Sequence, residues 1–392
     1  MNYDEFVTEV LPRDHMNATL VGRIFDPVEA GPSVVAIRQG LVVDISHIEP
    51  TVSSLFERED LTEIVREETP RKTWKLEDVL LATLSQDCKS PHFLTPIDLQ
   101  VVKAAGVTFV HSMIERVIEE RAIGDPMRAE SIRAQLNIVV GGSLSNVRPG
   151  SPEAQKIKEV LMSQNLWSQY LEVGIGPDPE VFTKAPVLSA VGLGAAVGVL
   201  ERSTWNNPEP ELVLAVTSKG EPVGAALGND VNLRDFEGRS ALLLAEAKDN
   251  NASCAIGPFV RLFDQSFTLQ SVRELEIRLQ VKGLDGFEMD GVSSMTAISR
   301  DVLELVKHSF GDHHQYPDGF VLFTGTLFAP TKDRDQPGAG FTHHRGDTVV
   351  ISTPQLGSLI NHVMTSEAAP NWTIGIMALM RNLVNRGLLP ST

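Results

Sequence analysis

Three carboxylates lie at the two ends of a sequence segment whose pattern is typical of a β-hairpin. Glu209 and Glu211 open an apolar run, and a second extended run follows a short polar stretch and leads to Asp230. Side chains alternate along a strand, so Glu209 and Glu211 should project from the same face. If Lys219-Gly220 is a two-residue loop, counting outward places Asp230 opposite Glu209 on that face.

A shared divalent cation is the simplest way to make such a cluster favourable, because three like charges held close together repel one another. Ligands that are all oxygen favour a hard ion such as magnesium, calcium or manganese over zinc or copper. The prediction depends on the register, since a slip of one residue would turn Asp230 to the opposite face. The alternative interpretation is a solvated hairpin of an acidic protein.

The composition indicates a soluble globular protein and disfavours some classes of binding partner. The chain has 392 residues, 42% of them hydrophobic and 22% charged, which is ordinary for a soluble globular protein of two or three domains. A formal net charge of −17 disfavours nucleic acid and anionic membrane surfaces as partners. The two cysteines, Cys88 and Cys254, suggest reduced thiols, and the first residues lack the pattern of a secretory signal. We therefore expect a cytoplasmic protein without a membrane partner.

The elements that must position the carboxylates suggest a mixed α+β fold that is mainly β. Short extended runs between about residues 18 and 48 predict a small β-rich N-terminal domain over residues 1–95. We then expect residues 96–392 to form a second, catalytic domain. Within it, residues 125–170 are charged and helical in pattern, which predicts a helical insertion or a lid.

A predicted helix over residues 112–121 supplies a second group of polar side chains. A short helix over 99–105 and a strand over 106–110 are expected before it. Four of its polar residues recur at spacings of three and four and can share one face: Ser112, Arg116, Glu119 and Glu120. A solvated face with internal ion pairs is the alternative.

Lys248 follows an apolar run that begins at Ala241. A lone lysine in such a place is ordinarily a surface residue. Beside a divalent cation, however, the pKa of its amine would tend to fall, which would make it available for proton transfer.

Six sequence blocks lie in a definite order between about residues 170 and 370. They are Phe182–Pro186 with Val191–Gly194, Pro208–Val216, Gly228–Asp235, Lys248, Gly257-Pro258 and Thr324–Thr326. In order and spacing these blocks resemble the fumarylacetoacetate hydrolase superfamily. The resemblance implies a β-roll-like catalytic fold and a homodimer or homotetramer. It also implies Glu209, Glu211 and Asp230 as ligands of magnesium, with calcium or manganese as substitutes.

Hydrolases and decarboxylases of that superfamily typically carry a catalytic histidine followed three residues later by glutamate. Here Ser112 takes the place of the histidine, although Glu115 follows at the right interval and His111 is one residue out of register. Further blocks resemble instead the branch of 2-keto-3-deoxy-D-pentonate dehydratases: Ala105–Phe109, Ser112, Arg116, Glu119-Glu120, Pro179–Phe182 and Asp235–Gly238. That branch converts 2-keto-3-deoxy-D-arabinonate or D-xylonate to 2,5-dioxopentanoate, also called α-ketoglutarate semialdehyde.

The chemistry of this branch suits the residues. A cation that binds a 2-keto acid polarises the ketone and stabilises an enolate when the adjacent methylene loses a proton. We assign enolisation to Lys248 and acid/base assistance to Glu180, and the two roles are interchangeable at this level. Thr326 and Arg234 would hold the acid end of the substrate or support the metal shell. The candidates around the sugar hydroxyl groups are Ser112, Arg116, Glu119 and Glu120.

The leading interpretation is a magnesium-dependent hydro-lyase of pentose catabolism, as in D-xylose degradation, that acts on a 2-keto-3-deoxy sugar acid. Hydrolysis of acylpyruvates or diketo acids would use the same metal pocket, with Glu115 helping to activate water. A binding protein without enzymatic activity is the third class. It is disfavoured because unused like charges in a pocket are costly.

Overall fold

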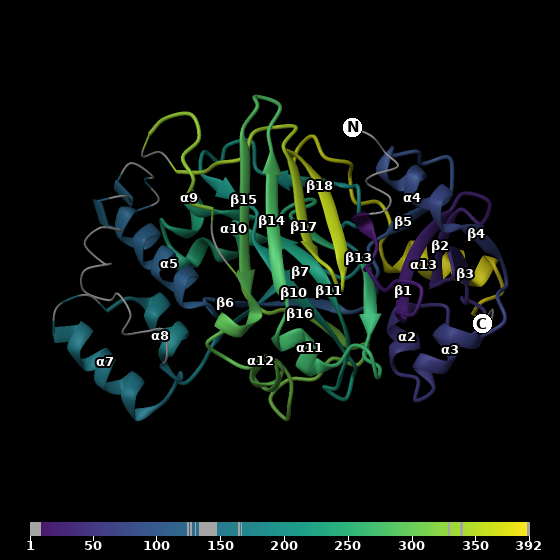
Figure 1. Cartoon of the computed structure of the whole chain (residues 1–392), viewed down its shortest axis with the longest axis horizontal. Helices are drawn as coiled ribbons and strands as arrows, with labels where there is room; N and C mark the ends of the chain where they lie inside the picture. The colour runs from purple at the N-terminus through teal and green to yellow at the C-terminus, as the bar shows by residue number, and fades with distance from the viewer. Residues whose placement is uncertain are drawn as a thin grey trace.

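The structure is a computed structural model that describes residues 9–123, 125, 128–129, 131–132, 147–163, 165, 167–327, 330–337 and 340–389. Sheets occupy the centre of the molecule, and helices from residues 110–175 gather at one end (Figure 1). The N-terminal elements and the C-terminal helix lie together at the other end. The expected mixed α+β fold, mainly β, is confirmed.

The larger sheet has eleven strands within the described residues. They are β1 (Leu20–Asp26), β2 (Gly31–Arg38), β3 (Leu41–Asp44), β4 (Thr73–Lys75), β5 (His92–Leu94), β6 (Val101–Gly106), β7 (Glu180–Ala185), β10 (Pro210–Val216), β11 (Pro222–Asp230), β13 (Cys254–Leu262) and β16 (Phe320–Phe323). Their order is β4-β3-β2-β1-β13-β11-β10-β16-β6-β7, with β5 paired to β1. Only β6 and β16 pair in parallel among these strands.

In the described part of the chain, five strands form a second sheet. They are β8 (Ala196–Val199), β14 (Glu276–Lys282), β15 (Glu288–Ser294), β17 (Thr348–Thr353) and β18 (Gly357–Thr365), in the order β15-β14-β17-β18-β8. Along β14 buried Ile277, Leu279 and Val281 alternate with more exposed residues, so one face of this sheet covers the core. Two short strands, β9 (Asn206–Asn207) and β12 (Asn232–Leu233), form a separate pair.

The hairpin of β10 and β11 is buried on both faces. Leu214 of β10 belongs to the hydrophobic cluster that includes Ile277 of the second sheet. Its neighbour Val213 points the other way, into a cluster with Val260 and Leu55. This double burial explains why β10 is a continuous apolar run rather than an alternating one.

The loop of the hairpin is longer than the expected two residues. Thr217 donates its backbone N–H to the Glu221 carbonyl, which leaves three residues in the loop, and Gly220 has a φ of +78°. Both common two-residue hairpin turns, types I′ and II′, require positive φ at the first loop residue, which the side chain of Lys219 disfavours. A bulge between Ala215 and Val216 then restores the register, so that Glu211 lies opposite Gly228 as counting outward from the loop predicts.

The expected helix over residues 99–105 is wrong, and so is the strand over 106–110. Val101–Gly106 is strand β6, between β16 and β7. A short apolar run fits either type of element, and pairing with two neighbouring strands decides the outcome here. The next helix, α5 (Val110–Ala122), agrees with the expected helix over 112–121.

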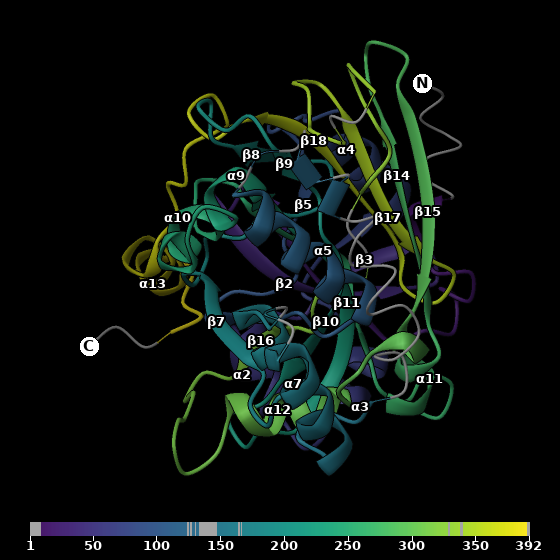
Figure 2. The ribbon, with the colours of Figure 1, turned by 90° about the vertical axis from the view of Figure 1, so that its left-hand side faces the viewer.

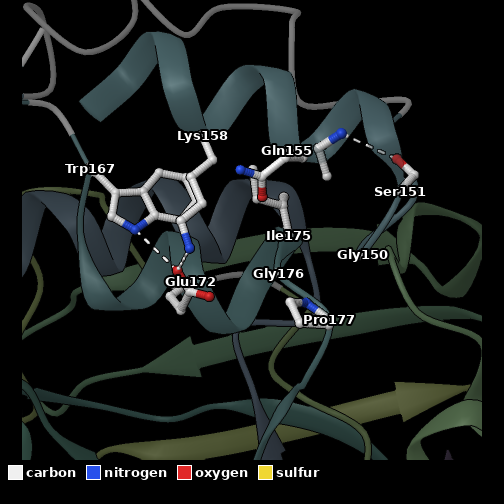
Figure 3. Close-up of a pocket in the computed structure, with 10 residues that line it drawn as sticks. Gly150, Ser151, Gln155, Lys158, Trp167, Glu172, Ile175, Gly176 and Pro177 are labelled. Atoms are coloured by element: carbon white, nitrogen blue, oxygen red, sulfur yellow. Dashed lines mark hydrogen bonds and ion pairs between the residues drawn. The ribbon is translucent and has the colours of Figure 1, made fainter. Parts of the chain in front are cut away.

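Helices α5, α7 (Pro152–Ser163) and α8 (Gln169–Ile175) form a layer at one end of the molecule, facing the viewer in Figure 2. Figure 3 shows that Lys158 of α7 and the indole N–H of Trp167 both reach the Glu172 carboxylate of α8, at 2.5 and 3.2 Å. Within residues 125–170 the described part is helical mainly in α7 and at the start of α8, whereas residues 147–151 and 167–168 are not helical. The role of this range as an insertion or a lid stays a prediction. Residues 126–127, 130, 133–146, 164 and 166 of that range lie outside the described part.

The N-terminal strands continue the sheet that carries the hairpin, because β1 pairs with β13. The assignment of residues 1–95 to a separate domain stays a prediction. The remaining helices are α2 (Val52–Phe56), α3 (Leu61–Glu67), α4 (Leu76–Leu84), α9 (Arg234–Glu237), η1 (Ala241–Leu243), α10 (Leu244–Lys248), α11 (Leu269–Arg273), η2 (Met295–Ala297), α12 (Val302–Ser309) and α13 (Ile376–Asn385). In the described part of the chain no helix combines the length and hydropathy that a membrane span requires.

Substitution of Gly220 tests the loop. A Cβ at this position would lie 2.3 Å from Phe310 Cδ1 and would also have to adopt a left-handed φ. We expect Gly220→Ala to lower the free energy of unfolding in urea by about 2 to 4 kcal/mol. Gly286→Ala is the matched control, since Gly286 has a φ of +83° and open space around it. It should cost only about 1 kcal/mol. Equal losses in the two variants would contradict the packing of Gly220 against Phe310.

Candidate metal centre

The hairpin brings the three carboxylates together. Glu209 directly precedes β10, Glu211 is its second residue, and Asp230 ends β11. The Asp230 N–H donates to the Glu209 carbonyl at 3.0 Å, which places these two residues side by side. One oxygen from each of the three side chains lies within 4.8 Å of the others, and all three residues are at most 2% exposed.

One oxygen of each carboxylate is already held by a neighbouring group. Arg116 of α5 pairs with Glu209 Oε1, and Lys184 of β7 lies 2.7 Å from Asp230 Oδ1. The Gly325 backbone N–H donates to Glu211 Oε2 at 2.7 Å. These contacts fix the orientation of the carboxylates.

Lys248, at the end of α10, bridges two of the remaining oxygens. Its Nζ lies 2.5 Å from Glu209 Oε2 and 3.0 Å from Asp230 Oδ2, and it stands over the Phe182 ring at 5.8 Å. Burial lowers the pKa of this amine, but the charges of Asp230, Glu209 and Glu237 outweigh burial and raise the pKa above its ordinary value. The expected fall in this pKa therefore requires a cation at the carboxylates.

The electrostatics of the cluster favour such a cation. Burial, and then the charges of Asp230 and Glu209, raise the pKa of Glu211 well above its ordinary value. Five carboxylates and three cationic side chains line the cavity or contact its carboxylates, namely Glu180, Glu209, Glu211, Asp230 and Glu237 against Arg116, Lys184 and Lys248. Two negative charges are left over when all are ionised, and one is left over when Glu180 is protonated, so an added cation is favoured in either case. The all-oxygen donor set fits magnesium, calcium or manganese.

The three carboxylates open on a small cavity of about 10 Å³, close to the space that one water molecule needs. Glu180 lines it from β7, opposite Gly106 of β6. A Cβ on Gly106 would lie 1.9 Å from Glu180 Oε2, so glycine is required for this approach. Burial and the charge of Glu237 raise the pKa of Glu180 to about 7.

The predicted substrate-binding residues lie in different places. Arg116 and Thr326 line the cavity, and Arg116 also lies 2.9 Å from Glu237 Oε2. The Ser112 hydroxyl donates to the Thr326 carbonyl at 2.7 Å, behind the cavity wall.

Two further predicted residues are not seen at the cavity. Arg234 is buried over the Trp205 ring and donates to the Pro330 carbonyl at 3.1 Å; it is not among the described residues that line the cavity. Glu119 belongs to α5, and its side chain lies outside the described part.

Three contributors were missed from the sequence: Lys184, Glu237 and the Gly325 N–H. Alternation along a strand would have found Lys184, because it shares a face of β7 with Glu180 and Phe182. Glu237 lies one turn after Arg234 in a polar stretch, without a spacing that sets it apart. A backbone donor such as the Gly325 N–H has no sequence pattern beyond the glycine itself.

The sequence is similar to one protein family and to two dehydratases. Residues 171–364 match the family described as fumarylacetoacetate (FAA) hydrolase C-terminal. The "Probable 2-keto-3-deoxyxylonate dehydratase" of Haloferax volcanii is 35% identical over 196 residues, 50% of this chain and 64% of that protein. The 2-dehydro-3-deoxy-D-arabinonate dehydratase of Saccharolobus solfataricus is 30% identical over 185 residues, 47% of this chain and 58% of that protein. The chain thus spans less than two thirds of either relative.

Solved structures agree on the fold. A 2-keto-3-deoxy-D-arabinonate dehydratase complexed with magnesium and 2,5-dioxopentanoate superposes with a TM-score of 0.61 at 21% identity, over 88% of this chain and 99% of that one. A 5-carboxymethyl-2-hydroxymuconate delta-isomerase from Mycobacterium smegmatis reaches 0.53 at 18% identity, over 88% and 98%. Residues 171–364, which contain all three candidate metal ligands, therefore resemble the FAA hydrolase family.

Proposed function

We propose that the protein is a magnesium-dependent dehydratase that converts 2-keto-3-deoxy-D-pentonate to 2,5-dioxopentanoate and water. The observation that carries this proposal is the buried cluster of Glu209, Glu211 and Asp230 with Lys248 beside it. The names of the two relatives supply the substrate class. The same substrate class would place the reaction in pentose catabolism, as in D-xylose degradation.

Glu209, Glu211 and Asp230 would hold the ion. Magnesium, when bound, supplies a Lewis acid that polarises the 2-keto group and stabilises the negative charge that develops as C3 loses a proton. Arg116, Lys184 and the Gly325 N–H keep the three carboxylates oriented through their outer oxygens.

Lys248 and Glu180 are the groups that move protons. We assign removal of the C3 proton to Lys248 Nζ and protonation of the departing C4 hydroxyl to Glu180. A pKa of about 7 keeps much of the Glu180 carboxyl protonated at neutral pH, which suits a proton donor. The C3 proton and the C4 hydroxyl together leave as water. The resulting C3=C4 alkene, with its hydroxyl at C5, becomes a C4=C5 enol when a proton leaves C5 and a proton is added at C3. The enol reaches 2,5-dioxopentanoate when its hydroxyl proton moves to C4.

Thr326 is the cavity-lining candidate for contact with the acid end of the substrate. Ser112 and Arg234 would act through the backbone segments that they hold, at Thr326 and Pro330. The role of Glu119 at the sugar hydroxyls stays a prediction, as does assembly into a homodimer or homotetramer.

Hydrolysis of acylpyruvates or diketo acids is the less favoured reaction. It would need a group that activates water, and Ser112 occupies the place of the family's histidine with its hydroxyl committed to the Thr326 carbonyl. Glu115 is buried and is not among the described residues that line the cavity.

Product analysis tests the proposed reaction. Protein supplied with magnesium and 2-keto-3-deoxy-D-pentonate should produce 2,5-dioxopentanoate, followed by NMR. EDTA should stop the reaction and excess magnesium should restore it. Glu211→Gln should lower kcat/KM by at least about 100-fold, because it removes one of the three ligand charges. Unchanged sugar acid, together with cleavage of an acylpyruvate under the same conditions, would contradict the dehydratase.

The pKa of Glu180 predicts a pH-dependent stability. The folded protein keeps this proton up to about pH 7, whereas an ordinary glutamate releases it near 4.5. The stability conferred by the neutral carboxyl is thus complete at low pH and is lost as pH rises through 7, by about 2 to 3 kcal/mol. Urea unfolding of the metal-free protein and of Glu180→Gln between pH 4.5 and 8 measures this loss.

The glutamine variant cannot ionise and should not show that loss, so its stability relative to the wild type should increase across this range. A difference between the two proteins that does not change with pH would contradict the shifted pKa. The same variant should lower kcat by at least about 100-fold if Glu180 donates the proton.

A further inference from the structure

The amine of Lys248 lies where a metal ion would bind. It contacts Glu209 Oε2 and Asp230 Oδ2, and the outer oxygens of these two carboxylates are held by Arg116 and Lys184. An ion that binds between Glu209 and Asp230 through their free oxygens would thus need the two atoms that Lys248 now holds.

The cavity is also too small to hold both the Lys248 amine and a metal ion beside the carboxylates. The cavity beside the carboxylates has a volume of about 10 Å³ and is lined by Lys248 itself. Two cations that share the same pair of oxygens would also repel each other strongly in a buried site. The ammonium group and a divalent ion therefore compete for one position.

We propose that Lys248 serves as an internal cation that holds Glu209 and Asp230 together in the metal-free protein and is displaced from them when a divalent ion binds. The displaced amine stays among the other carboxylates that line the cavity, Glu180 and Glu237. Metal binding thereby releases the amine from its ion pairs and turns it toward the cavity. This inference rests on the proposed metal site and is independent of the reaction that the site catalyses.

Removing the charge of Lys248 should therefore strengthen metal binding. We expect Lys248→Met to bind Mg²⁺ at least about tenfold more tightly than the wild type in calorimetric titrations of metal-free protein, because no ion pairs have to break. Lys103→Met is the matched control. Lys103 is also a buried lysine of the large sheet, but its Nζ donates to the Thr183 hydroxyl at 3.0 Å. This control should leave the Mg²⁺ affinity unchanged.

Thermal unfolding gives a second readout that does not depend on activity. Without metal, Lys248→Met should melt at a lower temperature than the wild type, because its carboxylates have lost their cation. Saturating Mg²⁺ should then raise its Tm by more than it raises that of the wild type. Lys248→Arg keeps the positive charge and should bind Mg²⁺ no more tightly than the wild type, which covers the case in which the methionine variant does not fold without metal.

Equal or weaker Mg²⁺ binding by Lys248→Met would overturn the proposal, as would a failure of the wild type to bind Mg²⁺, Ca²⁺ or Mn²⁺. Tighter binding by Lys248→Arg would also overturn it. These outcomes are distinct from a failure of the dehydratase assignment. Wild-type protein that forms 2,5-dioxopentanoate while Lys248→Met shows unchanged metal affinity would leave the proposed function in place and remove only this inference.

Discussion

Negative charge gathered in the interior is the constraint on which the rest of this structure depends. Glu209, Glu211 and Asp230 are each at most 2% exposed and approach within 4.8 Å of one another. Burial of a charge without compensation is among the most unfavourable arrangements in a protein. The cluster is tolerable because Arg116 and Lys184 hold its outer oxygens and Lys248 bridges its inner ones.

The fold delivers these compensating groups from segments that are far apart in the chain. Strands β10 and β11 carry the carboxylates, β7 brings Lys184 and Glu180, and α5 brings Arg116 from the helical layer at one end of the molecule. Sheet pairing fixes most of these positions, since β6 stands between β16 and β7 and sets Gly106 opposite Glu180. Without a side chain at Gly106, the Glu180 carboxyl can come close to the sheet. The candidate metal ligands and the Glu180 carboxyl are therefore positioned by one sheet.

Local patterns in the sequence predicted that the three carboxylates lie together. Strand alternation and the position of the turn were enough to bring Asp230 beside Glu209, although the loop has three residues, because a bulge at Ala215 and Val216 restores the register. The pairing of strands that are far apart in the sequence could not be predicted in the same way. Val101–Gly106 reads equally well as a helix or a strand until its neighbours are known. Alternation can place Lys184 on the same face of β7 as Glu180, but the contacts of Arg116 with Glu209 and of Lys184 with Asp230 depend on distances between elements and were hidden.

The central claim is that Glu209, Glu211 and Asp230 bind a divalent cation. Anomalous diffraction from crystals soaked in Mn²⁺ tests it most directly. We predict a single strong peak coordinated by Glu209, Glu211 and Asp230, with Lys248 Nζ moved away from Glu209 Oε2 and Asp230 Oδ2. A peak elsewhere, or a site without manganese in which Lys248 keeps both contacts, would contradict the account.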